Sequence, residues 1–372
     1  MNPLVVGIVG CGNISDIYFQ AGARFEAIAI GACADLNQSL AEAKAKKYDV
    51  ARVLSTEDLL ADPDIDIVLN ITQPKAHAEV ALAAVATGKH VYNEKPLTLT
   101  RDEGRQLLES ARKQGVRVGC APDTVLGAGI QTARKAIDDG WIGKPVSATA
   151  FMQCPGHESW HPNPEFYYEA GGGPMLDMGP YYLTALVTLL GPAAHVSSVT
   201  RTTYKKRLIT SAPKKRKEIV VETPTHLTGL VEFENDVVCT MITSFDVWRG
   251  SLPCIEIHGT DGSLSVPDPN GFGGPVKLFR PGYEDWESLP LSHCYNDNAR
   301  GLGLADMAAA IHADREHRAN GTLAYHVLDI MHAFLDGGST HARVPVESRC
   351  ERPAPMPMLL ADGHTEAHQR TQ

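Results

Sequence analysis

The sequence predicts an α/β protein with two domains, an N-terminal doubly wound parallel sheet and a C-terminal α+β domain with a mostly antiparallel sheet. Up to residue 122, apolar strands alternate with helical segments, as in parallel sheets with helical crossovers. Beyond it, segments with period-two alternation follow one another, as in hairpins. The 372 residues are enough for two separate cores. We expect domains at residues 1–122 and 123–350, and a proline-rich, then polar tail at 351–372.

The first domain opens on a continuous apolar run at residues 4–9, typical of a strand buried on both faces. Further strands are expected at residues 27–33, 65–71, 89–92 and 116–120, with helices at 38–47, 57–60, 77–87 and 102–114.

In the second domain, period-two alternation and the turns at residues 234–236 and 260–262 predict two hairpins. The expected strands are residues 146–152, 227–233, 237–244, 255–258 and 263–266, and the expected helices are 130–139, 304–313 and 323–335. A further amphipathic helix is expected to open in the glycine-rich segment at 171–173 and to continue to residue 190.

The composition limits the kinds of molecule that the protein is expected to bind. A formal net charge of −10 argues against binding to nucleic acid or to an anionic membrane. We see no apolar run approaching the ~18 residues that span a bilayer, and no leader-like segment before residue 4. The eight cysteines are scattered without a C-x-x-C pair, which favours free thiols in the cytoplasm. Two short basic runs, at residues 205–207 and 214–217, are interpreted as a solvated loop.

The segment Gly10-Cys11-Gly12-Asn13-Ile14-Ser15 follows the first strand and matches the G-x-G-x-x-G pattern, with serine in the third place. Gly10 permits the tight turn and Gly12 lets the backbone approach a pyrophosphate at a helix N-terminus. Asp35 ends the second strand, where an acidic residue accepts bonds from the adenosine ribose. We expect NAD rather than NADP, because Asp35 would repel a 2′-phosphate and no arginine follows it.

Two loops at strand ends should lie on the cofactor side of the sheet, where ligands of open parallel sheets bind. One contains Thr72, Pro74 and His77, and the other contains Glu94 and Lys95. Pro96 stops the strand and so fixes the backbone after Lys95. The alternative is a solvated lysine in an ordinary strand-to-helix loop.

Asp177 and Tyr181 follow the glycine-rich segment and would share one face of a helix, four residues apart. A carboxylate and a phenol on one face can hold a sugar hydroxyl and exchange its proton. The alternative is that Asp177 is a first-turn residue favoured by the helix dipole and that Tyr181 is a packed aromatic.

The segment His157-Glu158-Ser159-Trp160-His161 contains H-E-x-x-H, the zinc-protease motif, which requires a regular helix. Prolines at 155, 162 and 164 disfavour that helix. We therefore expect no metal, and a substrate loop in which His157, Trp160 and His161 contact a sugar ring.

Two further residues are substrate-site candidates. Asp123 starts the crossover into the second domain and is expected to face the crevice, with a helix cap as the alternative. Arg300 could reach the substrate, or pair with the acidic surface instead.

Together, the glycine turn, Thr72-x-Pro74 with His77, Glu94-Lys95-Pro96 and the Gly-Gly-Gly…Asp177-x-Gly179-x-Tyr181 segment resemble the glucose–fructose oxidoreductase/inositol dehydrogenase (Gfo/Idh/MocA) family. The resemblance is close over residues 4–122 and 171–192. It implies an NAD(P)-dependent oxidoreductase acting on a sugar, cyclitol or related polyol, and a homodimer or homotetramer formed through the C-terminal sheet. Lys95 would lie beside the nicotinamide, and Lys95, Asp177 and Tyr181 would be catalytic.

Many members of this family have histidine four residues after the aspartate, where this chain has Tyr181. The glucose–fructose oxidoreductase and dihydrodiol dehydrogenase branches resemble it here, and whether Lys95 or Tyr181 donates the proton is left open. We expect burial beside a cationic nicotinamide to lower the pKa of Lys95. The rival functions are an NAD-dependent glycosidase, which would release product without net NADH, and a non-catalytic NAD-binding sensor.

Overall fold

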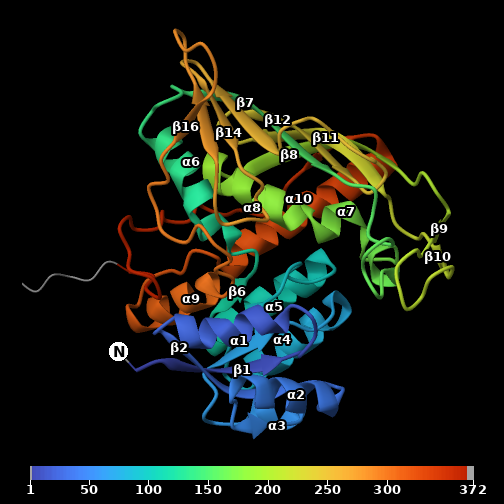
Figure 1. Ribbon diagram of the computed structural model, residues 1–372, viewed down its shortest axis with the longest axis vertical. Coiled ribbons are helices and arrows are strands. Elements are labelled where there is room, and N and C mark those ends of the chain that lie inside the picture. Colours follow the sequence, from blue (N-terminus) through green and yellow to red (C-terminus); the bar gives the residue numbers. More distant parts are fainter. Residues whose placement is uncertain (1, 367–372) are drawn as a thin grey trace, which may run out of the picture.

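The computed structural model describes residues 2–366 and contains two large sheets stacked across layers of helices (Figure 1). The N-terminal sheet has six strands, all parallel, in the order β3-β2-β1-β4-β5-β6. Its strands are β1 (Leu4–Val9), β2 (Ile28–Ala34), β3 (Arg52–Val53), β4 (Ile67–Asn70), β5 (His90–Asn93) and β6 (Val118–Cys120). The doubly wound parallel sheet is thus confirmed, although β3 was not expected.

The helices of this domain are α1 (Ser15–Arg24), α2 (Gln38–Tyr48), α3 (Thr56–Ala61), α4 (His77–Ala86) and α5 (Arg101–Gln114). The ends of α5 show why its boundaries could be predicted from the sequence. Thr100 and Glu103 form a reciprocal capping box at its start, and Gly115 ends it in the left-handed conformation.

The second sheet has nine strands in the order β16-β15-β14-β13-β7-β12-β11-β8-β17. The five strands expected here are present as β7 (Pro145–Gln153), β11 (His226–Phe233), β12 (Val238–Ser244), β13 (Ile255–Gly259) and β14 (Ser263–Val266). The strands β8 (Ala193–Arg201), β15 (Val276–Phe279), β16 (Glu287–Leu289) and β17 (Arg343–Pro345) were not anticipated. In the described part of the chain, β7 and β12 form its only parallel pair, so the sheet is mostly antiparallel.

Helices α6 (Ala128–Asp138), α8 (Gly179–Leu190) and α10 (Gly321–Thr340) lie between this sheet and the N-terminal domain, as Figure 1 shows. Every residue of α8 is buried, so it is not the amphipathic helix that we expected. α10 packs on β8 and on α8, and its other side contacts α5. With α9 (Leu302–His312), which contacts β6 and β2, it joins the two domains.

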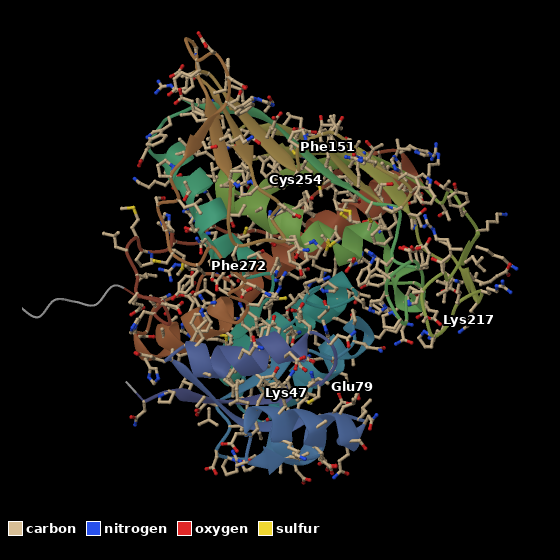
Figure 2. The ribbon with its side chains drawn as sticks, viewed as in Figure 1. Lys47, Glu79, Phe151, Lys217, Cys254 and Phe272 are labelled. Carbon is tan, nitrogen blue, oxygen red and sulfur yellow. The ribbon has the colours of Figure 1, made fainter. Side chains whose placement is uncertain are left out.

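Two segments reach beyond this frame. β9 (Lys206–Leu208) and β10 (Glu218–Val220) form a separate antiparallel hairpin, and Lys217 lies on this arm at the edge of the molecule (Figure 2). The described part of the tail packs against the body: Gln131 accepts a hydrogen bond from the Met356 amide, and Met356 and Leu360 are buried. The proposed domain boundaries and the tail beyond residue 366 stay predictions.

None of the helices formed by residues 2–366 is long and apolar enough to cross a membrane. All eight cysteines are unpaired.

A first prediction concerns Arg101, which joins α5 to α10. Its Nε donates to Oδ1 of the buried Asp329 at 2.5 Å, and its Nη1 donates to Asp336 at 2.7 Å. Arg101→Met leaves the Asp329 carboxylate without its cation, and hydrogen bonds to charged groups contribute roughly 1.5–3 kcal/mol. We expect the free energy of unfolding, measured in urea, to fall by about that amount.

The matched control is Arg105→Met on the same helix. Arg105 is exposed and forms a 3.3 Å pair with Asp102, a kind of pair that contributes little. Equal losses in the two variants would contradict the role given to Arg101.

Candidate active site

The turn after β1 has the geometry that a dinucleotide requires. Gly10 has a φ of +105°, and a Cβ there would lie 2.7 Å from the Ile71 carbonyl oxygen, so other residues are excluded. Nothing lies within 4 Å of the position where Gly12 would carry a Cβ. Ser15 Oγ donates to the Gly12 carbonyl at 2.7 Å and opens α1. The open surface over Gly12, at a helix N-terminus, fits a pyrophosphate.

Asp35 ties this turn to the end of β2. Its Oδ2 accepts a hydrogen bond from the Cys11 amide and its Oδ1 accepts one from the Asn37 amide, both at 2.7 Å. Each carboxylate oxygen has a second lone pair, which leaves capacity for ribose hydroxyls. Asn13 and Ile14 are exposed on the turn beside it. The residues predicted to bind the adenosine side of the cofactor thus lie together at the glycine turn.

His77 lies behind the strand-end loops and not on their surface. It is 1% exposed, with Nδ1 2.7 Å from the Pro96 carbonyl oxygen and Nε2 3.1 Å from that of Thr72. Burial lowers the pKa of His77, against the opposite effect of the two carbonyls. His77 therefore holds the loop of Thr72 and Pro74 against the loop that carries Lys95.

The centre of the site is an ion pair between the two domains. Lys95, after β5, donates from Nζ to Oδ1 of Asp177 and to its backbone carbonyl oxygen, both at 2.7 Å. The two side chains are 17% and 14% exposed. Two residues 82 positions apart in sequence thus meet in the crevice where the sequence placed both.

The charge state of this pair corrects one expectation. Burial alone would lower the pKa of Lys95, but the charges of Asp177, Tyr181 and Glu94 raise it above its ordinary value. Burial likewise opposes ionisation of Asp177, yet Lys95 and His157 lower the pKa of that carboxyl to about 2. Our expectation of a lowered lysine pKa is wrong for the protein on its own, because it left out the carboxylate facing Lys95.

Asp177 and Tyr181 do not share one helix face. The chain forms a short helix α7 (Gly173–Asp177), breaks at Met178 and starts again as α8. Pro180 in the first turn of α8 has no N–H to continue the ladder from α7. Tyr181 still reaches the site, because Lys95 Nζ lies 5.3 Å from the centre of its ring. Burial raises the pKa of Tyr181, while Lys95 and Arg300 act against that rise.

Glu94 faces the other side of the crevice. Its Oε1 accepts a hydrogen bond from Tyr18 Oη of α1 at 2.7 Å, and its Oε2 accepts one from the Lys95 amide at 2.9 Å. Glu94 is thereby held between the glycine-turn helix and the catalytic candidate Lys95.

The two remaining candidates for substrate binding, Arg300 and Asp123, lie in different surroundings. Arg300 donates to Asn298 Oδ1 at 2.9 Å and to Asn270 Oδ1 at 2.7 Å, and lies close enough to Tyr181 for each to shift the other's pKa. Asp123 is 1% exposed, and its Oδ2 accepts bonds from the Gly301 and Gly303 amides at 2.8 and 3.0 Å. Arg300 therefore borders the site, while Asp123 lies beneath it and caps α9.

The segment with the zinc-protease pattern forms turns and no helix, as expected. His157 Nε2 lies 3.3 Å from Asp177 Oδ2, opposite Lys95. Trp160 is 60% exposed and meets the rings of His157 and His161 edge-on, each centre at 5.3 Å. His161 Nδ1 accepts a bond from the Asn163 amide at 3.0 Å. The structure thus brings His157 to the centre and leaves Trp160 and His161 at its rim.

Sequence reasoning missed two parts of this site. Tyr167, in the 3₁₀ helix η3 (Glu165–Tyr167), packs on His157 with ring centres 4.2 Å apart. Burial, and secondarily the charge of Asp177, raise its pKa. Phe245, directly after β12, also packs on His157, at 4.6 Å. The aromatic run at residues 166–168 beside the histidine loop was the available signal.

Arg207, which we had placed in a solvated basic run, is in fact buried in the support of the loop. Its guanidinium donates to Glu158 Oε1 at 2.5 Å, to the Pro155 carbonyl at 3.0 Å and to Asp246. Its side chain is 6% exposed. The β9–β10 hairpin thereby clamps the histidine loop, whereas Lys214 and Lys217 pair with Glu165 at the surface.

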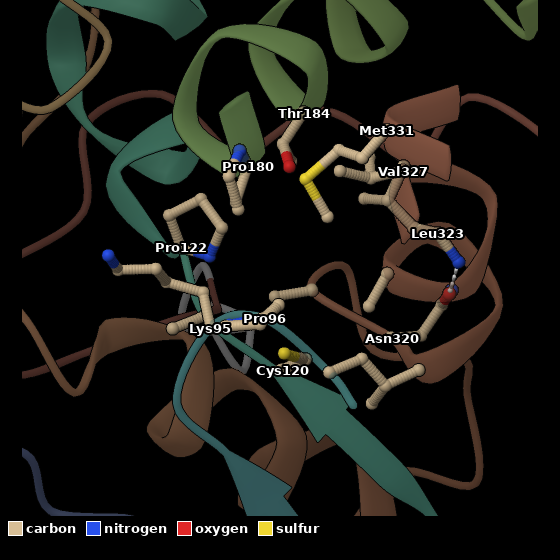
Figure 3. A pocket seen from close by; sticks show the side chains of 14 residues that line it. Lys95, Pro96, Cys120, Pro122, Pro180, Thr184, Asn320, Leu323, Val327 and Met331 are labelled. Atoms are coloured by element: carbon tan, nitrogen blue, oxygen red, sulfur yellow. Dashed lines mark hydrogen bonds between the residues drawn. The ribbon is translucent and has the colours of Figure 1, made fainter. Parts of the chain in front are cut away.

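A small cavity lies on the far side of Lys95 from the ion pair. Figure 3 shows the Lys95 side chain leading away from it while Pro96, Pro122, Thr184 and Met331 line it. Its walls are mostly apolar, and residues of both α8 and α10 contribute to them.

Comparison with known proteins identifies the class that this fold and site define. Residues 4–121 match the oxidoreductase family with an NAD-binding Rossmann fold, and residues 130–265 match the GFO/IDH/MocA C-terminal domain. The chain belongs to the Gfo/Idh/MocA family of nicotinamide-dependent oxidoreductases.

The chain is similar to several individual enzymes in sequence or in fold. The chain is 33% identical over 217 residues to 1,5-anhydro-D-fructose reductase of Ensifer adhaerens, covering 57% of this chain and 60% of that enzyme. It is 30% identical over 214 residues to D-glucoside 3-dehydrogenase of Escherichia coli, covering 55% and 59%. The matches thus span about three fifths of each enzyme. Levoglucosan dehydrogenase in complex with NADH shares the fold, with a TM-score of 0.80 at 20% identity over 93% of this chain and all of that one.

The buried Asp123 carboxyl predicts a pH dependence of stability. Burial, more than the opposing amides and Arg300, raises its pKa to about 6. The folded protein binds this proton more tightly than the unfolded chain, in which the carboxyl has a pKa of about 3.9. The stability gained from this difference is fully present below that pH and is lost as the pH rises through 6. Asp123→Asn cannot ionise and keeps an acceptor oxygen. We expect the variant to gain up to about 3 kcal/mol relative to the wild type between pH 4 and 6.5, measured by urea unfolding.

The comparison uses the difference between the two proteins at each pH, so titration of all other groups cancels. A difference that stays constant from pH 4 to 6.5 would mean that Asp123 is ionised throughout.

Proposed function

We propose that this protein transfers a hydride between a nicotinamide and a carbinol or carbonyl carbon of a sugar, cyclitol or related polyol. The observation that carries the proposal is the Lys95–Asp177 ion pair, with Tyr181 beside it, at the carboxyl ends of the parallel strands. In doubly wound sheets the cofactor lies at this edge. A substrate bound between the domains would therefore contact both the cofactor and these side chains.

The substrate class is supported by the polar groups around the crevice. Asp177 can accept from a hydroxyl, and Lys95, Arg300 and the tyrosines can donate to one. Such a mixed set suits a polyhydroxylated ring better than an apolar alcohol. The names of the relatives above refer to a sugar-derived ketone and to glucosides.

In the proposed mechanism, a bound nicotinamide supplies the hydride acceptor or donor. The protein's own groups manage the reacting oxygen. Lys95 is held protonated by Asp177, so it donates a hydrogen bond to that oxygen and stabilises negative charge developing on it. Tyr181 hydrogen-bonds or relays the proton at the same place, and Asp177 orients a neighbouring hydroxyl.

We predict that Lys95→Met lowers turnover by about 10²–10⁴-fold, the usual contribution of such a group. The affinity for NADH should change little, because the glycine turn and Asp35 lie apart from Lys95. Tyr181→Phe should lose less if Tyr181 only orients the substrate, and a non-additive double variant would show that the two act together. The assay is NADH absorbance with a panel of sugars and polyols.

The matched control is Lys113→Met, which removes an exposed lysine of α5. Near-normal turnover by Lys95→Met would refute the mechanism. A panel in which no compound changes the NADH signal would refute the proposed function itself.

We also propose NAD as the cofactor in preference to NADP, because Asp35 would repel a 2′-phosphate. NADH should show the lower dissociation constant when binding is followed by cofactor fluorescence. Asp35→Ala should narrow the preference without abolishing binding, while Asp64→Ala, an exposed carboxylate elsewhere in the domain, should leave it unchanged. Tighter binding of NADPH by the wild type would contradict this proposal.

The assembly that we propose is a cytoplasmic homodimer or homotetramer formed through the C-terminal sheet. The outer face of this sheet exposes apolar side chains on three adjacent strands: Val238, Leu230 and Val199. Phe151 lies on the same sheet, labelled in Figure 2. Exposed apolar side chains on adjacent strands of one sheet face are compatible with a protein interface there.

A further inference from the structure

Tyr167 carries a hydroxyl group without a partner beside the ion pair. Its ring packs on His157, with ring centres 4.2 Å apart, and His157 Nε2 in turn contacts Asp177 at 3.3 Å. Among residues 2–366 no hydrogen bond to the Tyr167 hydroxyl is formed, and its oxygen is accessible to solvent. Most side-chain polar groups in a folded protein are paired, so a free hydroxyl in a crevice is available to a ligand.

The segment that carries Tyr167 is attached to both sides of the crevice. At its start, Glu165 accepts a hydrogen bond from Lys214, between β9 and β10, at 2.6 Å. Four residues later, Glu169 forms an ion pair with Lys75 of the N-terminal domain. Lys75 lies in the loop after β4, at the carboxyl ends of the parallel strands. These two attachments hold Tyr167 near the edge of the sheet where a cofactor binds.

The neighbouring Tyr168 shows what a tyrosine with a structural role looks like. Its side chain is fully buried, its hydroxyl donates to Glu158, and its oxygen accepts a hydrogen bond from the His157 amide at 3.3 Å. Tyr167 makes none of these bonds. Of two adjacent tyrosines, the fold therefore uses the hydroxyl of one and leaves the other free.

The charges that act on Tyr167 place its hydroxyl near the reacting groups. Burial raises the pKa of Tyr167, the charges of Asp177 and Tyr181 add to that rise, and Lys95 acts against it. Electrostatic effects fall off with distance, so the phenol lies within range of all three side chains. The raised pKa keeps the hydroxyl protonated at neutral pH, so it can donate a hydrogen bond as well as accept one.

The other polar groups of the crevice already have a role in the proposed mechanism. Lys95 Nζ gives two of its three N–H groups to Asp177, which leaves one for the reacting oxygen. Tyr181 acts at the same oxygen, and Asp177 orients a neighbouring hydroxyl. Tyr167 then remains as a free donor and acceptor for a third oxygen of the substrate.

We propose that Tyr167 is a specificity-determining residue whose hydroxyl binds a hydroxyl of the substrate that does not react. This deepens the proposed function and rests on it. The substrate is then a cyclic polyol with at least three free hydroxyls close together: the reacting one, its neighbour at Asp177, and one at Tyr167. A site built to bind a hydroxyl discriminates against an analogue that lacks it, because the polar group of the protein is left unpaired.

The first test is Tyr167→Phe, which removes the hydroxyl and keeps the ring that packs on His157. For oxidation of the best panel compound, we expect kcat/KM to fall by about 2–10-fold, the net contribution of a neutral hydrogen bond. The loss should appear in KM with kcat nearly unchanged, because the contact is the same before and during reaction. Tyr204→Phe, the same change at an exposed tyrosine, is the control. A Tyr167→Phe enzyme with wild-type kcat/KM would overturn the proposal.

The second test uses deoxy analogues of that compound, each lacking one hydroxyl. The analogue without the hydroxyl bound by Tyr167 should be a poorer substrate of the wild type and should react equally well with wild type and Tyr167→Phe. Every other analogue should still distinguish the two proteins. A loss by Tyr167→Phe of the same size across the whole series would mean that the hydroxyl acts through the loop structure, and would overturn the proposal.

Binding measurements separate this proposal from the proposed function. Calorimetry on protein saturated with NADH gives dissociation constants for the same series without turnover, because an alcohol cannot reduce a cofactor that is already reduced. The same single exception in the series would support the Tyr167 contact, even if no compound changes the NADH signal and the proposed function fails. Turnover without that exception would refute the contact alone, and a protein that neither binds nor converts any compound would refute both.

Discussion

The ion pair between Lys95 and Asp177 is the constraint on which the rest of the site depends. It joins the end of a strand in one domain to the end of a short helix in the other. Burying two charges costs desolvation energy that can exceed their mutual attraction, so such a pair is weak evidence for stability. The effect of the pair is to position side chains. Lys95 binds one oxygen of the Asp177 carboxylate and His157 contacts the other, so side chains from three separate segments meet at this carboxylate.

Most of the N-terminal domain could be predicted because its signals are local. Apolar strands, caps such as the Thr100–Glu103 box and the glycine turn each depend on neighbours within a few residues. Asp35 was found by its distance from that turn, and the structure brings its carboxylate to the turn's own backbone. Periodicity also predicted the two hairpins of the second sheet, where each strand pairs with the next in sequence.

The rest depends on partners distant in sequence. Four-residue spacing suggested one helix for Asp177 and Tyr181, whereas the break at Met178 separates them and Lys95 brings them together again. Arg207 appeared as one cation in a basic run, and only the fold shows that Glu158 and Asp246 neutralise it in the interior. The raised pKa of Lys95 was missed for the same reason, since its strongest partner lies 82 residues away.

The contacts of Arg207, on the β9–β10 hairpin, with the loop of residues 155–164 affect the order in which the parts of the protein can fold. During synthesis the loop of residues 155–164 leaves the ribosome well before Arg207, which follows Glu158 by 49 residues, and before Asp246, the second carboxylate that this arginine binds. The N-terminal domain can fold by then, since domains generally fold as units in order of synthesis. The loop, by contrast, has no neutralising partner for Glu158 until β9 has emerged. The parallel sheet of the nucleotide half can therefore form while the substrate half is still an open chain.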